Sequence, residues 1–83
     1  MKLVYFAWLR EHVGLNEEQI ELPESIKTVA DLLNWQKSRG DAYERAFSEP
    51  DTVRVALDHF HSEHSDKLEG AEEVAFFPPM TGG

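Results

Sequence analysis

Apolar residues follow a period of two in several segments of the chain, which is the pattern of β-strands. Residues 1–8 are apolar at both sets of alternating positions, and this predicts a strand that is covered on both faces inside a sheet. Residues 19–22 and 53–58 alternate polar with apolar side chains, as half-buried strands do. Residues 73–77, with the sequence EVAFF, are expected to form the last strand.

A helical period begins at Thr28 and predicts the main helix of the chain. The Thr28 hydroxyl can cap the first turn, and Asp31 can return a hydrogen bond to the Thr28 amide in a variant of the capping box. Gly40 is expected to end this helix. Three further segments are expected. Residues 9–13 form a helical turn that stops at Gly14, residues 41–47 form a short helix, and residues 61–66 form a polar loop.

The predicted order is strand, strand, helix, strand, strand, which is the order of an α+β domain. One helix between two strand pairs can cover one face of a mixed sheet. Because crossover connections are right-handed, the first and last strands are expected to be parallel neighbours at the sheet centre. The sequence therefore predicts a β-grasp, or ubiquitin-like, domain over residues 1–77 and an extended C-terminal tail over residues 78–83.

Composition narrows the function classes. The chain has 83 residues, which is enough for one domain with one core. Its net charge of −8 argues against nucleic-acid binding and suits docking onto basic partner surfaces. No apolar run approaches the roughly 20 residues of a membrane span, and residues 1–8 lack a signal-peptide pattern, so a cytoplasmic protein is expected. Without cysteine, the chain has no disulfide, thiolate metal site or cysteine nucleophile.

The tail combines stiff residues with slender ones. Pro78 and Pro79 have no backbone N–H, so the sheet ladder must end there. Six extended residues reach about 20 Å from the sheet. Gly82 and Gly83 have no Cβ and can pass through a narrow channel. The α-carboxylate of Gly83 is the functional group at the tip, and it becomes a reactive acyl group once it is coupled to a leaving group such as an adenylate. The pattern predicts an acyl group presented to other enzymes.

Three stretches of the chain resemble the small, sulfur-carrying subunits of molybdopterin synthase. Residues 73–83, EVAFFPPMTGG, are similar to the ending of that family. Residues 6–14, FAWLREHVG, resemble its F-A-x-x-R-E-x-x-G signature, and residues 55–58, VALD, stand where the family usually reads V-A-V-N. The chain departs from the family pattern at three positions. Asp58 stands where the family usually has Asn, Ala71 replaces a glycine, and His61 stands where an apolar interface residue is common.

The resemblance implies a pathway and its partners. An adenylating enzyme related to the ubiquitin activators would activate Gly83 with ATP, and a sulfur donor protein would convert it to a thiocarboxylate. The tail would then enter a large synthase subunit, in a heterotetramer, and deliver sulfur to the cyclic pyranopterin precursor of the molybdenum cofactor. The chain would bind no cofactor or metal, and the large subunit would supply the catalytic residues. The residues carried over are Gly83 as carrier; Gly82, Thr81, Met80, Pro79 and Pro78 as tail; and Phe6, Phe77 and Arg10 as partner interface.

Other interpretations share the fold or dispense with the tail. A thiamine-type sulfur carrier or a ubiquitin-like protein modifier would use the same tail, and a plain interaction module would not use it. His59, His61 and His64 suggest either a zinc site or an exposed hairpin. Arg10 is expected to form a structural ion pair with Glu11 or to contact the exit of the tail. Two tryptophans, at positions 8 and 35, are expected at an interface or packed at the rim of the core.

Overall fold

The computed structural model describes residues 1–79 of the chain. Within them a five-stranded sheet is accompanied by three α-helices and one 3₁₀ turn. In chain order the elements are β1 (Lys2–Tyr5), α1 (Ala7–Val13), β2 (Glu17–Gln19), α2 (Val29–Lys37), α3 (Asp41–Ala46), the 3₁₀ turn η1 (Pro50–Thr52), β3 (Arg54–Leu57), β4 (Phe60–Ser62) and β5 (Glu73–Phe77).

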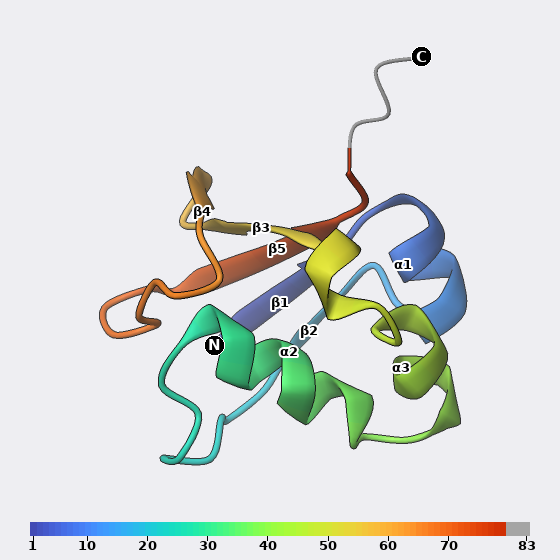
Figure 1. Ribbon diagram of the computed structural model, residues 1–83, viewed down its shortest axis with the longest axis horizontal. Helices are drawn as coiled ribbons and strands as arrows, with labels where there is room; N and C mark the ends of the chain where they lie inside the picture. Colours follow the sequence, from blue (N-terminus) through green and yellow to red (C-terminus); the bar gives the residue numbers. More distant parts are fainter. Residues whose placement is uncertain (80–83) are drawn as a thin grey trace.

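The strand order in the sheet is β2-β1-β5-β3-β4 (Figure 1). β1 and β5 are parallel, while the pairs β1–β2, β3–β5 and β3–β4 are antiparallel. α2 and α3 lie on one side of the sheet, and α1 packs beside α3 near the end where β5 leaves it. The first and last strands are therefore parallel neighbours at the centre, and the predicted β-grasp arrangement is confirmed.

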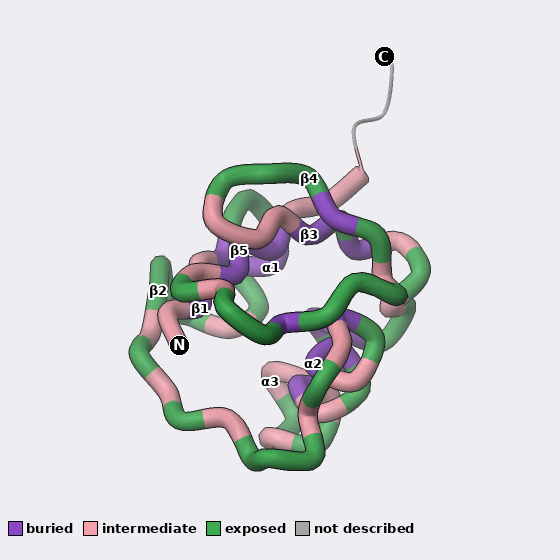
Figure 2. The backbone as a smooth tube through the Cα atoms, turned by 90° about the vertical axis from the view of Figure 1, so that its left-hand side faces the viewer, coloured by how far each residue is buried: buried purple, intermediate pink, exposed green. Residues whose placement is uncertain are grey.

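One hydrophobic core fills the space between the sheet and the helices. Phe76 of β5 lies at its centre, stacked on Tyr5 of β1 at 5.5 Å and edge-on to Phe47 at 5.2 Å between ring centroids. Leu32 and Leu33 close the core from α2, and both are fully buried. Figure 2 shows the buried segments concentrated where the sheet meets the helices. Alternate residues of the sheet thus face the core, as the period of two predicts.

A polar network joins β1, β2, α2 and α3 at the edge of this core. Arg39 donates to both carboxylate oxygens of Glu18, at 2.8 Å and 2.9 Å. The Tyr5 and Tyr43 hydroxyls donate to the same carboxylate at 2.6 Å and 3.0 Å. Gln36, which is fully buried, donates to the Tyr5 hydroxyl oxygen at 2.8 Å. Among residues 1–79, no buried side-chain nitrogen or oxygen lacks a hydrogen-bond partner.

The main helix begins as predicted. Thr28 Oγ1 accepts from the Asp31 amide, and Asp31 accepts from the Thr28 amide, each at 3.1 Å, so the capping box is complete. The helix does not run to Gly40 but ends at Lys37 with Ser38 as its C-cap. Gly40 has φ 138° and precedes α3 instead. The glycine signal was correct for a break in the chain but wrong for the end of this helix.

The first strand is shorter than predicted, because the chain turns out of the sheet after Tyr5. Phe6 is the N-cap of α1, and Ala7 has the left-handed φ of 53°. α1 then extends to Val13 and is capped by Gly14 at φ 86°, as expected. Residues 6–8 are apolar, like the strand before them, but they do not belong to the strand. A non-glycine residue at positive φ is uncommon, and hydropathy does not reveal it.

The second strand covers residues 17–19 rather than the predicted 19–22. The Ile20 amide still donates to the Met1 carbonyl at 2.9 Å, but the ladder ends at Gln19, which pairs with Lys2, the first residue of β1. The predicted loop over 61–66 is also partly wrong, since residues 60–62 form β4. β4 is an edge strand that pairs only with β3, so its polar sequence carries little strand signal.

Candidate functional site

β5 places the start of the tail beside the first strand. Val74 and Phe76 face the core and are fully buried, so Glu73, Ala75 and Phe77 face the opposite side of the sheet, here called the outer face. The Phe6 amide donates to the Phe76 carbonyl at 3.0 Å, which brings Phe6 beside Phe77. Pro78 and Pro79 then leave the sheet, both half-buried. The last predicted strand, residues 73–77, matches β5.

Four side chains surround this exit, and they are here called the tail-base surface: Phe6, Arg54, His61 and Phe77. Phe6 is 47% exposed. Arg54 of β3 pairs with Phe77 of β5 in the sheet register and is exposed. The His61 ring of β4 meets the Phe77 ring edge-on, with centroids 6.4 Å apart and an interplanar angle of 72°. The predicted interface residues Phe6 and Phe77 thus lie together at the base of the tail.

Arg54 is the member of this surface that the sequence analysis did not assign to the site, whereas His61 was noted as standing where the family commonly has an apolar interface residue. The alternation in residues 53–58 puts Arg54 on the face opposite Val55. This alternation shows which face of the sheet Arg54 occupies, but it does not show which residue of another strand lies beside it. Only the register, in which Arg54 lies opposite Phe77 and Ala56 lies opposite both Ala75 and His61, brings these residues to the tail.

Arg10, the third predicted interface residue, lies on α1 and is exposed. Within residues 1–79 it forms no ion pair, so the ion pair expected with Glu11 does not form. Adjacent residues on a helix point away from one another, which explains the error. The other expectation, a contact with the exit of the tail, involves residues outside those described.

The three histidines of residues 59–64 have separate partners. His59 lies in the β3–β4 turn, with Nδ1 3.5 Å from the Glu73 carboxylate, and His64 Nε2 lies 2.9 Å from the Val53 carbonyl oxygen. His61 contacts Phe77. In the described part of the chain no group of three or more His, Cys, Asp or Glu side chains is arranged to hold a metal ion. The hairpin interpretation is confirmed, and the zinc interpretation has no support among these residues.

Trp8 and Trp35 both pack against the core as partly buried side chains. The Arg39 guanidinium lies 4.9 Å from the Trp35 ring centroid. Trp35 therefore belongs to the rim of the core, where the sequence analysis placed it as one of two alternatives.

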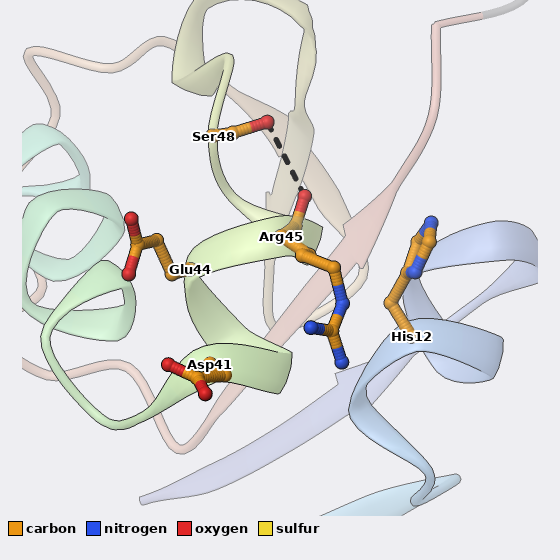
Figure 3. Close-up of a pocket in the computed structure, with 5 residues that line it drawn as sticks. All are labelled: His12, Asp41, Glu44, Arg45 and Ser48. Atoms are coloured by element: carbon orange, nitrogen blue, oxygen red, sulfur yellow. Dashed lines mark hydrogen bonds between the residues drawn. The ribbon is translucent and has the colours of Figure 1, made fainter.

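A surface pocket lies between α1 and α3 (Figure 3). Its lining residues are His12, Asp41, Glu44, Arg45 and Ser48. In Figure 3 the Arg45 side chain extends toward His12, while Asp41 and Glu44 lie on the other side of it. All five residues are exposed, and the hydrogen bond drawn between them is local, from Ser48 Oγ to the Arg45 carbonyl at 3.3 Å. This is a solvated depression between two short helices.

The predicted tail residues Met80, Thr81, Gly82 and Gly83 lie outside the described residues, so their roles stay predictions. No helix within residues 1–79 has the length and hydropathy to cross a membrane. The cytoplasmic location also stays a prediction. What the described residues provide is a rigid β-strand end, flanked by aromatic and cationic side chains, from which the tail departs.

Comparison with known proteins connects this geometry to a family. The model of the ThiS family matches residues 3–83. A molybdopterin synthase sulfur carrier subunit from Chlamydomonas reinhardtii is 34% identical over 85 residues, which span 100% of this chain and 98% of that protein. Among solved structures, a putative molybdopterin converting factor, subunit 1, from Pyrococcus furiosus is 33% identical with a TM-score of 0.74, over 95% of each chain.

A further solved structure shares the fold at lower identity. Small archaeal modifier protein 1 from Haloferax volcanii has a TM-score of 0.71 over 96% of this chain and 97% of its own. Its sequence identity is 20%, so this likeness concerns the fold alone.

Proposed function

Since this chain belongs to the ThiS family, we propose that it is the sulfur carrier subunit of a molybdopterin synthase. The observation that carries the proposal is the 34% identity to a molybdopterin synthase sulfur carrier subunit along the entire chain. The geometry agrees, because the C-terminal strand lies at the sheet centre and releases the tail beside exposed Phe6. A central strand paired on both sides holds the base of the tail firmly.

The proposed chemistry takes place on Gly83. Its carboxylate attacks ATP on an adenylating enzyme of the ubiquitin-activating type, and pyrophosphate leaves. A sulfur nucleophile then attacks the acyl carbon, and AMP leaves. When that nucleophile is sulfide, the product is the thiocarboxylate directly, without any change of oxidation state. In the cell a donor protein supplies the sulfur. When the donor attacks as a persulfide, the product is an acyl disulfide, and a second thiol must reduce its S–S bond, itself becoming a disulfide, to release the thiocarboxylate. ATP is consumed by the partner rather than held by this chain.

The proposed partner is a molybdopterin synthase large subunit, in a heterotetramer of two copies of each chain. The tail-base surface meets it, with Phe6 and Phe77 as apolar contacts and Arg10 nearby on α1. Aromatic side chains that are exposed in the free protein are frequent anchors of interfaces. Gly83 then reaches the active site of the large subunit, whose residues carry out the transfer of sulfur to the cyclic pyranopterin precursor.

The rival functions predict different products from the same tail. A ubiquitin-like modifier would form isopeptide bonds to lysines of other proteins, and a thiamine-type carrier would deliver sulfur to a thiazole precursor instead. A plain interaction module would leave Gly83 unchanged. The relative at 34% identity favours the molybdopterin pathway, while the modifier at 20% identity supports only the shared fold.

Intact mass spectrometry tests the carrier function. The chain is incubated with an adenylating enzyme, ATP and sulfide, and the expected product is heavier by the exchange of one oxygen for one sulfur. The loaded chain is then mixed with a large subunit and the pyranopterin precursor, and dithiolene formation is measured. Removal of Gly83 is expected to abolish both the mass change and the product.

A matched control keeps the tail and alters a distant residue. Glu44→Gln changes an exposed carboxylate of α3, and it should load sulfur like the unmodified chain. An undiminished product yield from the chain without Gly83 would contradict the proposal. Lysine-linked conjugates in place of the thiocarboxylate would support the modifier function instead.

A further inference from the structure

His61 adds an ionisable group to an otherwise apolar part of the tail-base surface. Its ring contacts Phe77 edge-on, and its neighbour across the ladder is Ala56, which lies next to Ala75 of β5. We propose that His61 is part of the docking surface and makes the affinity for the large subunit dependent on pH, with tighter docking when the imidazole is neutral. This inference rests on the proposed function.

The groups around His61 decide whether its charge is compensated within the chain. A shallow pocket joins it to Asp51 of η1, Arg54 of β3 and the residues that follow β4, Glu63 and His64. From β5 it meets Phe77, which carries no charge. His61 is exposed and forms no ion pair within residues 1–79. In the free chain, water therefore solvates either protonation state.

Docking changes this balance. When a partner covers Phe6 and Phe77, the adjacent His61 ring loses water, and removing water penalises the charged imidazolium more than the neutral ring. Arg54 lines the same pocket and, like the carboxylates of Asp51 and Glu63, is exposed. The charges of these three groups act in opposite senses and are all screened by solvent, so the loss of water sets the sign of the effect.

The direction and size of the pH effect on docking affinity follow from proton linkage. An imidazole carries a proton in acid and is neutral in alkali, so on the acidic side docking has to release one proton. Release of one proton per complex weakens the affinity by at most about tenfold for each pH unit. On the alkaline side the imidazole is neutral in both states, and the affinity should be independent of pH.

The experiment measures the dissociation constant between the full chain and a large subunit from about pH 8 down to about pH 5.5. The dissociation constant is expected to rise as the pH falls through the acidic half of this range, by up to about tenfold per pH unit. His61→Leu and His61→Gln remove the ionisable group and should give flat profiles, apart from any slope of the large subunit itself. His12→Gln, on α1 away from β4, is the matched control and should keep the slope of the unmodified chain. Circular dichroism at each pH verifies that the variants stay folded.

The outcomes separate the two proposals. Equal slopes for the unmodified chain and His61→Leu would overturn the role of His61, and sulfur loading of Gly83 would still support the carrier function. A slope of opposite sign that depends on His61 would show that the partner supplies a carboxylate to the imidazolium, which also overturns the inference. Failure to bind the large subunit at about pH 8, together with failure to load sulfur, would overturn the proposed function and this inference with it.

Discussion

At the scale of single residues, the Glu18–Arg39 pair is the centre of a hydrogen-bond network at the edge of the core. The two side chains are 15% and 19% exposed, and the carboxylate of Glu18 accepts from Arg39, Tyr5 and Tyr43. The hydrogen bonds from Arg39 hold the pKa of Glu18 below its ordinary value, and burial raises the pKa of Tyr5. One carboxylate thus ties the edge strand β2 to β1 and to the residues after α2.

This pair predicts a specific loss of stability in acid. Because the folded-state pKa of Glu18 is lowered from the ordinary 4.5, its contribution is fully present above that value and is lost as the pH falls through the lower folded pKa. Glu18→Gln should therefore lower the free energy of unfolding by about 2 kcal/mol at neutral pH. It should also flatten the decline of stability below about pH 4.5. Urea unfolding across this pH range measures both effects.

The comparison variant is Glu44→Gln, which changes an exposed carboxylate on α3. It should reproduce the acid decline of the unmodified chain. Asp31, whose pKa is lowered by the backbone amides of Lys27 and Thr28, stays in both variants and leaves a residual slope. If Glu18→Gln declines in acid as steeply as Glu44→Gln, the network does not set the acid stability.

At the scale of elements, the chain uses local signals for its helices and long-range pairing for its strands. The capping box at Thr28 fixes the start of α2 through contacts no more than three residues apart. By contrast, β4 pairs only with β3, through a two-residue turn in which Asp58 and His59 both have positive φ. Asp58 supports that turn by accepting from the amides of Glu72 and Glu73, each at 2.9 Å. Its role depends on residues 14 and 15 positions away.

The capping box gives the prediction for α2. Thr28→Ala removes the hydroxyl that accepts from the Asp31 amide, and the free energy of unfolding should fall by about 1 kcal/mol. Thr28→Ser keeps an accepting hydroxyl and should lose much less. Urea unfolding compares the two. Equal losses for both variants would mean that the methyl group of Thr28, rather than its cap, stabilises this end of the helix.

At the scale of the whole molecule, β5 joins the core to the tail-base surface. Two neighbouring residues of this strand lie on opposite faces of the sheet. Phe76 is fully buried against Tyr5 and Phe47, whereas Phe77 faces outward. The tail therefore starts from the best-packed strand of the domain. This arrangement holds the base of the tail in a fixed place relative to Phe6.

Alanine at these two positions should separate folding from docking. Phe76→Ala leaves a cavity in the core and should lower the free energy of unfolding by about 4 kcal/mol. Phe77→Ala should lower it by no more than about 1 kcal/mol but weaken docking of the large subunit at least about tenfold. Urea unfolding and a binding titration measure the two effects. Normal docking by Phe77→Ala would remove Phe77 from the interface.

The sequence by itself determined the features that depend on local patterns. The period of two in residues 53–58 and 73–77, the helical period after Thr28 and the order of elements were sufficient for the β-grasp fold, because each reflects which side chains face the core. The chemistry of tail residues 78–83 predicted an acyl group presented to other enzymes, which stays a prediction, and the family resemblance added sulfur as the cargo. The resemblance also predicted Phe6 and Phe77 as interface residues, and their role at an interface stays a prediction.

Only the tertiary structure decided which distant residues meet. The register of β3 on β5 brings Arg54 and His61 to Phe77, and the left-handed turn at Ala7 ends β1 although the apolar run continues. Glu18 and Arg39, 21 positions apart in the chain, form their pair only after β2 and α2 have packed. Hydropathy records which face a residue occupies, whereas strand register and close packing are set by the balance of contacts over the whole sheet, and no local pattern encodes that balance.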